Sequence, residues 1–398
     1  MVRNEKNTQK DKKAIDGEWG IHFSDRFLAN ERFDPFQSYF DQDGMQIGHR
    51  TIFNPIRLHR PFEFKHTNHS SHERKNDNFS DTFCELVQGK SPAIVITKDE
   101  LLVNDLFSLK SRAENLNSSI VFTAINLYPP ISRIVKNINL NKEHSKKLPR
   151  GLSFIHVFTN HYKLPEDIPN GEWETFFRNY RLTLKESISH KAISSTDNLQ
   201  VATFFNIGSR AGASISHLHG QTILRLNKNG TGAKQNSYMI SSKQNENNCK
   251  KCQLWVDIDD STSFQGLSLI KRMIFRNTHW IAVLAYAPMR DSHIRLIPYR
   301  HISNIWSMND DELSSLASIL IKCNKRLTSF IEKYGERYYL SIDRNIIFNQ
   351  HYSTKKGHFH MFIDILPVQQ TGGAELFDDQ KFSMIYPEEV ALKMGSED

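Results

Sequence analysis

Long apolar runs are missing from this 398-residue sequence. Nowhere does it contain about 18 consecutive apolar residues, the length that a membrane-spanning helix requires. The first 16 residues, Met1 to Asp16, are rich in lysine, asparagine and aspartate and contain no apolar stretch, so the pattern of a secretory signal is missing too. We therefore expect a protein without membrane contact, with the cytoplasm as its default compartment.

Cysteine is scarce, with four residues in the chain. Only Cys249 and Cys252 are close in sequence, as Cys-x-x-Cys. In a reducing compartment such a pair predicts a metal or redox site before it predicts a structural disulfide. Cys323 falls on the apolar face of a predicted helix, and we expect it to be a small core residue.

Nucleic-acid-binding motifs are also missing, although the net charge of +7 is typical of proteins that bind nucleic acids. The basic residues are spread along the chain, and no zinc finger, helix-turn-helix or RNA-binding motif is recognisable. An enzyme that handles phosphates needs a positive excess as well. We expect small phosphorylated molecules, and not nucleic acid, as the main partners.

Polar segments divide the chain into two comparable parts. We expect a disordered tail at residues 1–20, an N-terminal half at 21–226, a polar insert at 227–248 and a C-terminal half at 249–398. Apolar residues at helical spacing predict one helix in each half, Trp173–Ser187 and Asp310–Lys333. Asn309 and Glu312 predict a capping box at the start of the second helix.

The two halves share their order of elements. Runs of β-forming residues surround each helix, at 119–125, 154–159, 200–206 and 222–226 in the first half and at 281–285, 293–298, 345–348 and 361–366 in the second. In both halves a His-x-His stands at the entrance of the last strand, His217–His219 and His358–His360. We therefore predict an internal duplication. The expected fold class is α+β, with two halves that each contain an antiparallel sheet and a packed helix, related by a pseudo-twofold axis.

Three nitrogen-bearing side chains share one face at the start of the last strand of the first half. Because side chains along a strand alternate between its faces, His217, His219 and Gln221 point to the same side. A neutral imidazole is a competent nucleophile toward phosphorus near pH 7, and an amide can donate to a phosphoryl oxygen as charge builds there. The pair of histidines alone fits structural or metal-binding roles as well.

The loop before these histidines is suited to an anion. Gly208 and Gly212 allow backbone N–H groups to approach one closely. Arg210 is a candidate phosphate ligand, and Ser214 adds a hydroxyl group. Together with the histidines, this loop predicts a site for phosphoryl chemistry.

The run from Asn206 to Gln221, Asn-Ile-Gly-Ser-Arg-Ala-Gly-Ala-Ser-Ile-Ser-His-Leu-His-Gly-Gln, resembles the active-site signature of a known group of enzymes. These are the galactose-1-phosphate uridylyltransferases and their ADP-sugar phosphorylase relatives, the transferase branch of the histidine-triad (HIT) superfamily. Every fixed position of Asn-x-Gly-x-x-x-Gly-x-Ser-x-x-His-x-His-x-Gln is kept. Shorter similarities occur at 126–129 (NLYP), 157–161 (VFTNH), 360–367 (HMFIDILP), 372–375 (GGAE) and 387–391 (PEEVA). The resemblance covers about residues 45–395 and is weak before residue 118.

This resemblance implies a HIT-like fold and a double-displacement transfer of a nucleoside monophosphate. His219 would accept the group from an NTP or NDP-sugar and pass it to a sugar phosphate or to inorganic phosphate. Gln221 would hold the transferred phosphoryl group, with His217 as the other member of the catalytic motif. The residues expected to bind the substrate are Asn126, Asn206, Gly208, Arg210, Gly212, Ser214 and His360. A homodimer is a further expectation.

The sequence departs from the family pattern at two places in the histidine motifs. Leu218 stands where these transferases usually have proline. In the second half Phe362 is aligned with Gln221, and a phenyl ring cannot stabilise an oxyanion. We therefore expect the chemistry in the first half, with His360 in a supporting role.

The resemblance also implies structural zinc at two sites. The first is expected at Cys249, Cys252, His279 and a residue near Asn349 or His351, of which we choose His351. The second matches Asp81, Cys84, His161 and His217, where Asp81 replaces a cysteine of the family. A carboxylate can bind zinc, but this replacement equally fits a lost site. For Cys249 and Cys252, an unoccupied pair in a solvated loop is the alternative.

Two other functions stay open at this point. Within the same superfamily, the protein could cleave an NDP-sugar or a dinucleoside polyphosphate with water or phosphate as the acceptor. A non-catalytic nucleotide- or RNA-binding protein on a degenerate copy of the fold is the second alternative. The intact pair of His219 and Gln221 favours an enzyme.

Overall fold

The computed structural model describes most of both halves. The described residues are 30–40, 46–53, 81–108, 111–133, 150–190, 199–226, 231–232, 269–351, 359–373, 375 and 381–395. The predicted tail at 1–20, nearly all of the insert at 227–248, Cys249, Cys252 and His358 lie outside them. Their predicted roles stay predictions.

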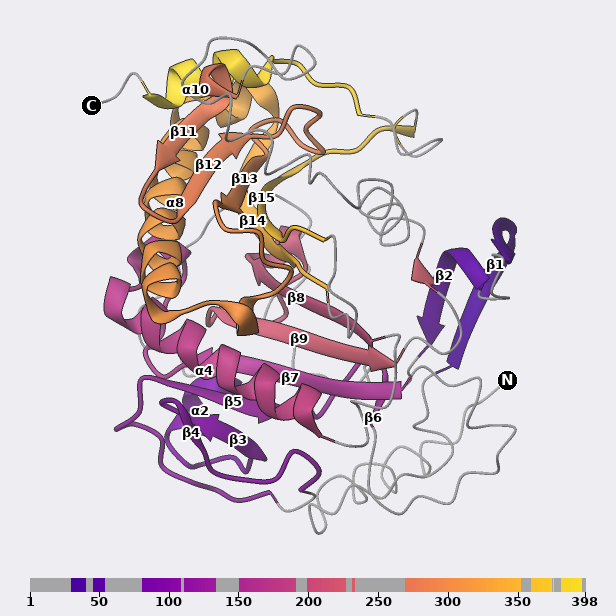
Figure 1. The fold of residues 1–398 in the computed structure, drawn as a ribbon, viewed down its shortest axis with the longest axis vertical. Coiled ribbons are helices and arrows are strands. Elements are labelled where there is room, and N and C mark those ends of the chain that lie inside the picture. The colour runs from indigo at the N-terminus through magenta and orange to yellow at the C-terminus, as the bar shows by residue number, and fades with distance from the viewer. Residues whose placement is uncertain are drawn as a thin grey trace, which may run out of the picture.

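One large sheet forms the centre of the molecule (Figure 1). Along its main path the strands follow the order β11-β12-β13-β15-β14-β8-β9-β7-β5-β3-β4, with β6 beside β7. Their bounds are Val95–Lys98 (β3), Leu101–Leu102 (β4), Val121–Ile125 (β5), Ser132–Arg133 (β6), Arg150–Phe158 (β7), Leu199–Ile207 (β8), His219–Leu226 (β9), Met273–Arg276 (β11), Trp280–Leu284 (β12), Ile294–Pro298 (β13), Leu340–Asn349 (β14) and Phe362–Gln369 (β15). A separate sheet joins β1 (Asn30–Phe40), β2 (Gln46–Phe53) and β10 (Thr231–Gly232). All neighbours on the main path pair antiparallel, as predicted.

Two long helices, α4 (Asn170–Ser189) and α8 (Asp310–Tyr338), cover one face of this sheet (Figure 1). Both predicted helices are confirmed, and α8 continues one turn beyond Lys333 because Tyr338 is buried against the core. The capping box is confirmed too, since Asn309 Oδ1 accepts from the Glu312 N–H at 2.8 Å and Glu312 Oε2 accepts from the Asn309 N–H at 2.9 Å. Cys323 is fully buried, as expected.

The remaining helices are short. They are α2 (Thr82–Val87) and α10 (Pro387–Gly395), with 3-10 turns at Pro165–Asp167, Ser209–Ala211, Ile270–Arg272 and Ile305–Ser307. Among the described residues, no helix is both long and apolar enough to cross a membrane.

The two halves have the same strand order when each is followed outward from the centre of the sheet. In the first half the order outward from the centre is β8, β9, β7, β5, β3, and in the second it is β14, β15, β13, β12, β11. The duplication and its pseudo-twofold relation are therefore confirmed in the fold. The two predicted sheets are in fact one, because β8 and β14 pair antiparallel across the centre, with Phe205 opposite Ile346.

The predicted alignment of the two histidine motifs is wrong by two residues. His217 Nε2 donates to the carbonyl oxygen of Phe158 at 2.8 Å, at the end of β7. The residue that repeats this contact is His360, whose Nε2 donates to the carbonyl oxygen of Pro298 at 2.8 Å, at the end of β13. His360 thus corresponds to His217 and not to His219. In the second half Phe362 occupies the position of His219, and Asp364 occupies that of Gln221.

Candidate active site and metal cluster

The candidate nucleophile lies on the face of the sheet that α4 leaves uncovered. Gly220 approaches the Phe176 ring of α4, and Thr222 joins a buried hydrogen-bond network under that helix. Because neighbouring side chains in a strand alternate, His219 and Gln221 point to the opposite face. The period of two in the sequence predicted this arrangement.

Two features of its surroundings keep His219 neutral and orient its ring. Burial lowers the pKa of His219 from its usual 6.5 to about 4, although the hydrogen bond to the His217 backbone opposes this shift. His219 Nδ1 lies 2.8 Å from the His217 carbonyl oxygen. A carbonyl can only accept, so Nδ1 carries the proton and Nε2 keeps its lone pair. Nε2 is therefore the ring nitrogen whose lone pair is available for bonding.

Gln221 lies beside this lone pair. Its Nε2 is 3.4 Å from His219 Nε2, so the amide and the imidazole nitrogen face the same space. A pocket of about 120 Å³ opens there. Its lining comes from α2, β5, β7, β9 and the loops beside them: Thr82, Phe83, Leu86, Ala93, Ala124, Ile125, Asn126, Leu127, Tyr128, Ile155, Ser214, Ile215, His219 and Gln221. The lining is mostly apolar with a few polar groups, as is typical of sites that bind small molecules.

Four of the predicted binding and catalytic residues line the pocket: Asn126, Ser214, His219 and Gln221. A further lining residue that contacts His219 was not predicted from the sequence. Asn126 Oδ1 accepts from the Tyr128 N–H at 2.9 Å, which fixes the turn that follows β5. The unpredicted residue is Phe83, whose ring contacts that of His219 edge-on with 4.8 Å between centroids. Its position between Asp81 and Cys84 is the signal that could have indicated it.

The glycine-rich loop joins β8 to the histidine motif. Gly208 and Gly212 have φ angles of +83° and +92°, a region that side chains other than glycine disfavour. Both glycines are thus required by the loop conformation. Arg210 lies in the short turn Ser209–Ala211 and is exposed. Asn206, at the end of β8, has its Nδ2 3.4 Å from the Gly212 carbonyl oxygen.

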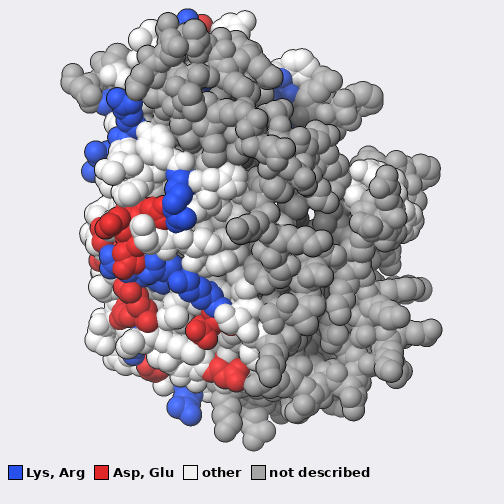
Figure 2. Space-filling view, viewed as in Figure 1, with Lys and Arg blue, Asp and Glu red and all other residues white. Residues whose placement is uncertain are grey.

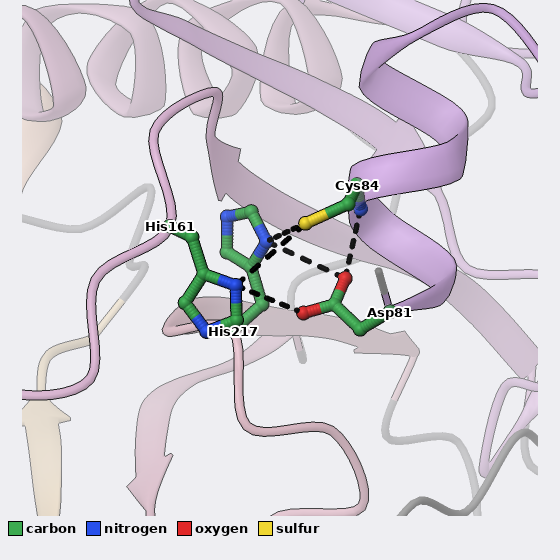
Figure 3. Close-up of side chains that lie close together, drawn as sticks. All are labelled: Asp81, Cys84, His161 and His217. Atoms are coloured by element: carbon green, nitrogen blue, oxygen red, sulfur yellow. Dashed lines mark hydrogen bonds and ion pairs between the residues drawn. The ribbon is translucent and has the colours of Figure 1, made fainter. Parts of the chain in front are cut away.

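Asp81, Cys84, His161 and His217 form a compact cluster next to the nucleophile (Figure 3). One ligand atom from each lies within 4.8 Å of all the others. Cys84 Sγ is 3.6 Å from His161 Nδ1 and 3.7 Å from His217 Nδ1. Asp81 Oδ2 is 3.4 Å from His161 Nδ1, and Asp81 Oδ1 is 3.5 Å from His217 Nδ1.

Local structure explains why these groups converge. Asp81 is the N-cap of α2, where its Oδ1 accepts from the Cys84 N–H at 2.8 Å. His217 Nε2 donates to Phe158, so its Nδ1 is deprotonated when the ring is neutral and faces the cluster. Burial raises the pKa of Asp81, but the neighbouring His217 ring and the hydrogen bond from the Cys84 N–H outweigh this effect and leave that pKa below its usual value.

The cluster has the character of a metal site. The Asp81 side chain is fully buried, and within the described residues its Oδ2 makes no hydrogen bond. A buried carboxylate oxygen without a donor is costly unless a cation lies near it. The four side chains offer sulfur, nitrogen and oxygen, the ligand atoms that zinc accepts. The donor set therefore fits a divalent metal.

The other predicted metal site lies partly outside the described residues, because Cys249 and Cys252 are not among them. His279 precedes β12 and His351 follows β14, and both are half-buried. His360, predicted to support the substrate, is buried and bonded to Pro298. Both the second metal site and the substrate-binding role of His360 stay predictions.

The surface in Figure 2 shows lysine and arginine interleaved with aspartate and glutamate over its described part. Over those residues, this face has no continuous basic stripe of the kind that binds nucleic acid.

No family model matches the chain. It is 21% identical over 349 residues to an ADP-glucose phosphorylase from Arabidopsis thaliana, which covers 86% of this chain and 88% of that protein. The solved structure of an ADP-glucose phosphorylase from Arabidopsis thaliana with bound ADP-glucose is 17% identical, with a TM-score of 0.58 over 93% of this chain and 99% of that one. A solved uridylyltransferase is 19% identical, with a TM-score of 0.54 over 69% of this chain and 85% of that one.

At this level of identity the solved structures show the fold alone, and that fold covers nearly the whole chain. The curated relative extends the likeness to the sequence over most of both proteins. The chain therefore has a HIT-like fold of two duplicated halves, and it resembles the galactose-1-phosphate uridylyltransferase and ADP-sugar phosphorylase branch of the HIT superfamily.

Proposed function

We propose that this protein is a nucleotidylyltransferase that moves a nucleoside monophosphate through a covalent bond to His219. The donor is an NDP-sugar or an NTP, and the acceptor is a sugar phosphate or inorganic phosphate. The observation that carries this proposal is the geometry of His219, a buried neutral imidazole whose Nδ1 is bound to a carbonyl oxygen and whose Nε2 faces Gln221 and the pocket.

In the first step the Nε2 lone pair attacks the α-phosphorus of the donor. The P–N bond forms while the bond from that phosphorus to the bridging oxygen breaks, and the β-phosphate leaves with the electron pair. In the second step an oxygen of the acceptor phosphate attacks the same phosphorus, the P–N bond breaks and Nε2 recovers its lone pair. The His217 carbonyl oxygen accepts from Nδ1–H throughout and stabilises the positive charge that the ring gains in the intermediate.

Gln221 acts on the oxygens of the transferred group. Its amide lies on the same face as His219, and an N–H aimed at an oxygen that gains charge in the transition state accelerates the step. The pocket between α2 and β5 takes the base, and Asn126 and Ser214 at its edge take polar groups of the nucleotide.

Phosphorolysis of an NDP-sugar is the case of this mechanism in which inorganic phosphate is the acceptor. The similarity to ADP-glucose phosphorylases favours this case.

We also propose that Asp81, Cys84, His161 and His217 hold a structural zinc. Tetrahedral coordination with Zn–S of about 2.3 Å and Zn–N of about 2.0 Å places sulfur and nitrogen about 3.5 Å apart, and nitrogen and oxygen about 3.3 Å apart. The corresponding distances in the cluster are 3.6 and 3.7 Å, and 3.4 and 3.5 Å. A zinc ion held by these four residues would link α2 to the histidine motif. His217 would then be held at both ring nitrogens, by the ion at Nδ1 and by the Phe158 carbonyl oxygen at Nε2, and its own carbonyl oxygen would stay directed at His219.

The experiment for the transferase is to incubate the protein with each NTP and each NDP-sugar labelled at the α-phosphorus, and then to measure acid-labile label on the protein. Wild-type protein should retain label from at least one donor, and His219→Ala should retain none. His219→Gly with added imidazole should regain turnover, because free imidazole can replace the missing ring. Label that persists in His219→Ala would refute the assignment, and absence of label from wild-type protein with every donor would favour the non-catalytic alternative.

A further inference from the structure

The glycine-rich loop of the first half is held by the second half of the chain. Asp343 on β14 accepts the backbone N–H of Arg210 at 2.8 Å through its Oδ2. A Cβ placed on Gly208 would lie 2.2 Å from the carboxyl carbon of Asp343. The carboxylate thus fills the space beside Gly208, which explains the glycine at this position in addition to its positive φ.

Asn345, two residues further along β14, makes two more contacts. Its Nδ2 donates to Asn206 Oδ1 at 2.9 Å and to the Ala211 carbonyl oxygen at 3.0 Å. The carbonyl of Ala211 can only accept, so the Asn345 group that faces the loop is its NH2. Asn206 must then present its oxygen to Asn345. The orientation of the Asn206 amide is therefore set from the second half.

The Asn206 amide that Asn345 orients lies beside His219. Asn345 and Asn206 are paired across β14 and β8, and Phe205 is paired with Gly220 across β8 and β9. The next pair in this register places Asn206 of β8 opposite His219 of β9. With its oxygen turned to Asn345, Asn206 directs its Nδ2 toward the loop, where it donates to the Gly212 carbonyl oxygen at 3.4 Å. A long hydrogen bond of this kind is readily exchanged for one to a phosphate oxygen.

We propose that Asp343 and Asn345 are positioning residues of the active site, supplied by the half that has no nucleophile of its own. Asp343 holds the loop at Arg210, and Asn345 turns the Asn206 amide donor toward the phosphates of a nucleotide bound at His219. This inference rests on the proposed function. It gives the second half, where Phe362 replaces the nucleophile, a role in the reaction.

Exchanging a carboxylate for an amide, or the reverse, should have different effects at positions 343 and 345. At 343 only an acceptor is used, so Asp343→Asn should retain activity whereas Asp343→Ala should lose it. At 345 only donors are used, so Asn345→Asp should be as harmful as Asn345→Ala although its shape is conserved. Asn309→Ala is the matched control, because it removes a helix cap in the same half without contacting the loop.

The readouts are the thermal midpoint of each variant, kcat and KM for label transfer, and the Kd for ADP and for UDP by calorimetry. At a temperature where all variants are folded, we expect Asn345→Asp and Asp343→Ala to lower kcat at least tenfold. Both should weaken binding of the preferred diphosphate at least fivefold. Asp343→Asn and Asn309→Ala should remain within about threefold of wild type, a difference of less than 1 kcal/mol.

Several results would overturn the inference. Wild-type kcat and Kd in Asn345→Asp would do so, as would equal losses in Asn309→Ala at the same thermal midpoint. If wild-type protein binds a diphosphate but never forms labelled histidine, the proposed function fails and the Kd values alone decide this inference. Wild-type protein that binds neither diphosphate and takes label from none of the donors overturns both.

Discussion

At the scale of single residues, the chemistry depends on which nitrogen of each imidazole is already engaged. His217 uses Nε2 for Phe158, which leaves Nδ1 for the metal cluster. His219 uses Nδ1 for the His217 carbonyl, and in the proposed reaction this leaves Nε2 for the substrate. The proposal thus gives two histidines on one face of a strand opposite roles, and each role follows from the hydrogen bond on the other side of the ring.

Gln221→Ala should leave the protein folded and slow label transfer by about a hundredfold, since it removes one donor to the charged transition state. Burst kinetics with labelled donor measure the rate of the first step. The binding constant for the donor should change much less than this rate. A loss confined to binding would show that Gln221 holds the ground state only.

His360→Ala should affect stability and not chemistry. His360 is buried and bonded to the Pro298 carbonyl, so its removal leaves that oxygen without a donor at a cost of about 1–3 kcal/mol. Urea denaturation measures this loss, and the rate of label transfer to His219 should stay within about threefold of wild type. Abolished transfer in a fully folded His360→Ala protein would mean that the active half has been misassigned.

At the scale of elements, the N-terminus of α2 connects the candidate metal site at Asp81, Cys84, His161 and His217 to the pocket. Asp81 caps the helix, Cys84 lies in its first turn, and Phe83 between them contacts the His219 ring. Rearrangement of this short helix would therefore affect both sites.

Removing the metal should lower the thermal midpoint by several degrees, because the bound ion stabilises only the folded state. Elemental analysis of purified protein, and thermal unfolding with and without a chelator, measure this effect. Asp81→Ala should have a lower midpoint than wild type and should no longer respond to the chelator. Asp81→Cys should retain the metal, because a thiolate suits zinc at the same position. A chelator response that survives in Asp81→Ala would place the ion elsewhere, for instance at Cys249 and Cys252.

At the scale of the whole molecule, buried polar groups tie the two halves together. Arg344 of β14 is fully buried and pairs with Glu166 of the first half at 3.1 Å. Gln350 of the second half donates to the hydroxyl of Tyr180 in α4 at 2.6 Å. That hydroxyl belongs to a network under the sheet in which Thr203 and Thr222 lead to His156. These contacts agree with one continuous sheet and not with two separable domains.

His156 should make stability depend on pH. Burial lowers the pKa of His156 from 6.5 to about 3. Below pH 6.5 the His156 side chain is therefore protonated in the unfolded chain but stays neutral in the folded protein. The stabilisation is complete above pH 6.5 and is lost as the pH falls toward 3. At pH 5 this loss of stability, relative to pH 7 and above, amounts to about 2 kcal/mol. Urea denaturation of wild type and His156→Gln at pH 7 and pH 5 tests this, because the variant should lose less stability between the two. An equal loss in both proteins would assign the pH dependence to other groups.

The sequence by itself determined the local features. Helical spacing predicted α4 and α8, and Asn309 with Glu312 predicted the capping box, since caps and apolar faces depend on residues within a few positions. The period of two along β9 placed His219 and Gln221 on one face for the same reason.

The tertiary structure alone decided how distant parts meet. The family resemblance implied that Asp81, Cys84, His161 and His217 meet, but no spacing in the sequence shows it. They meet because α2 lies next to the ends of β7 and β9. The contacts of Asp343 and Asn345 with the loop exist only because β14 pairs with β8. The alignment of the two histidine motifs was also beyond the sequence. A shift of two residues keeps every side chain on its face, so periodicity cannot distinguish His358 from His360 as the counterpart of His217. Only the hydrogen bond to the neighbouring strand does so.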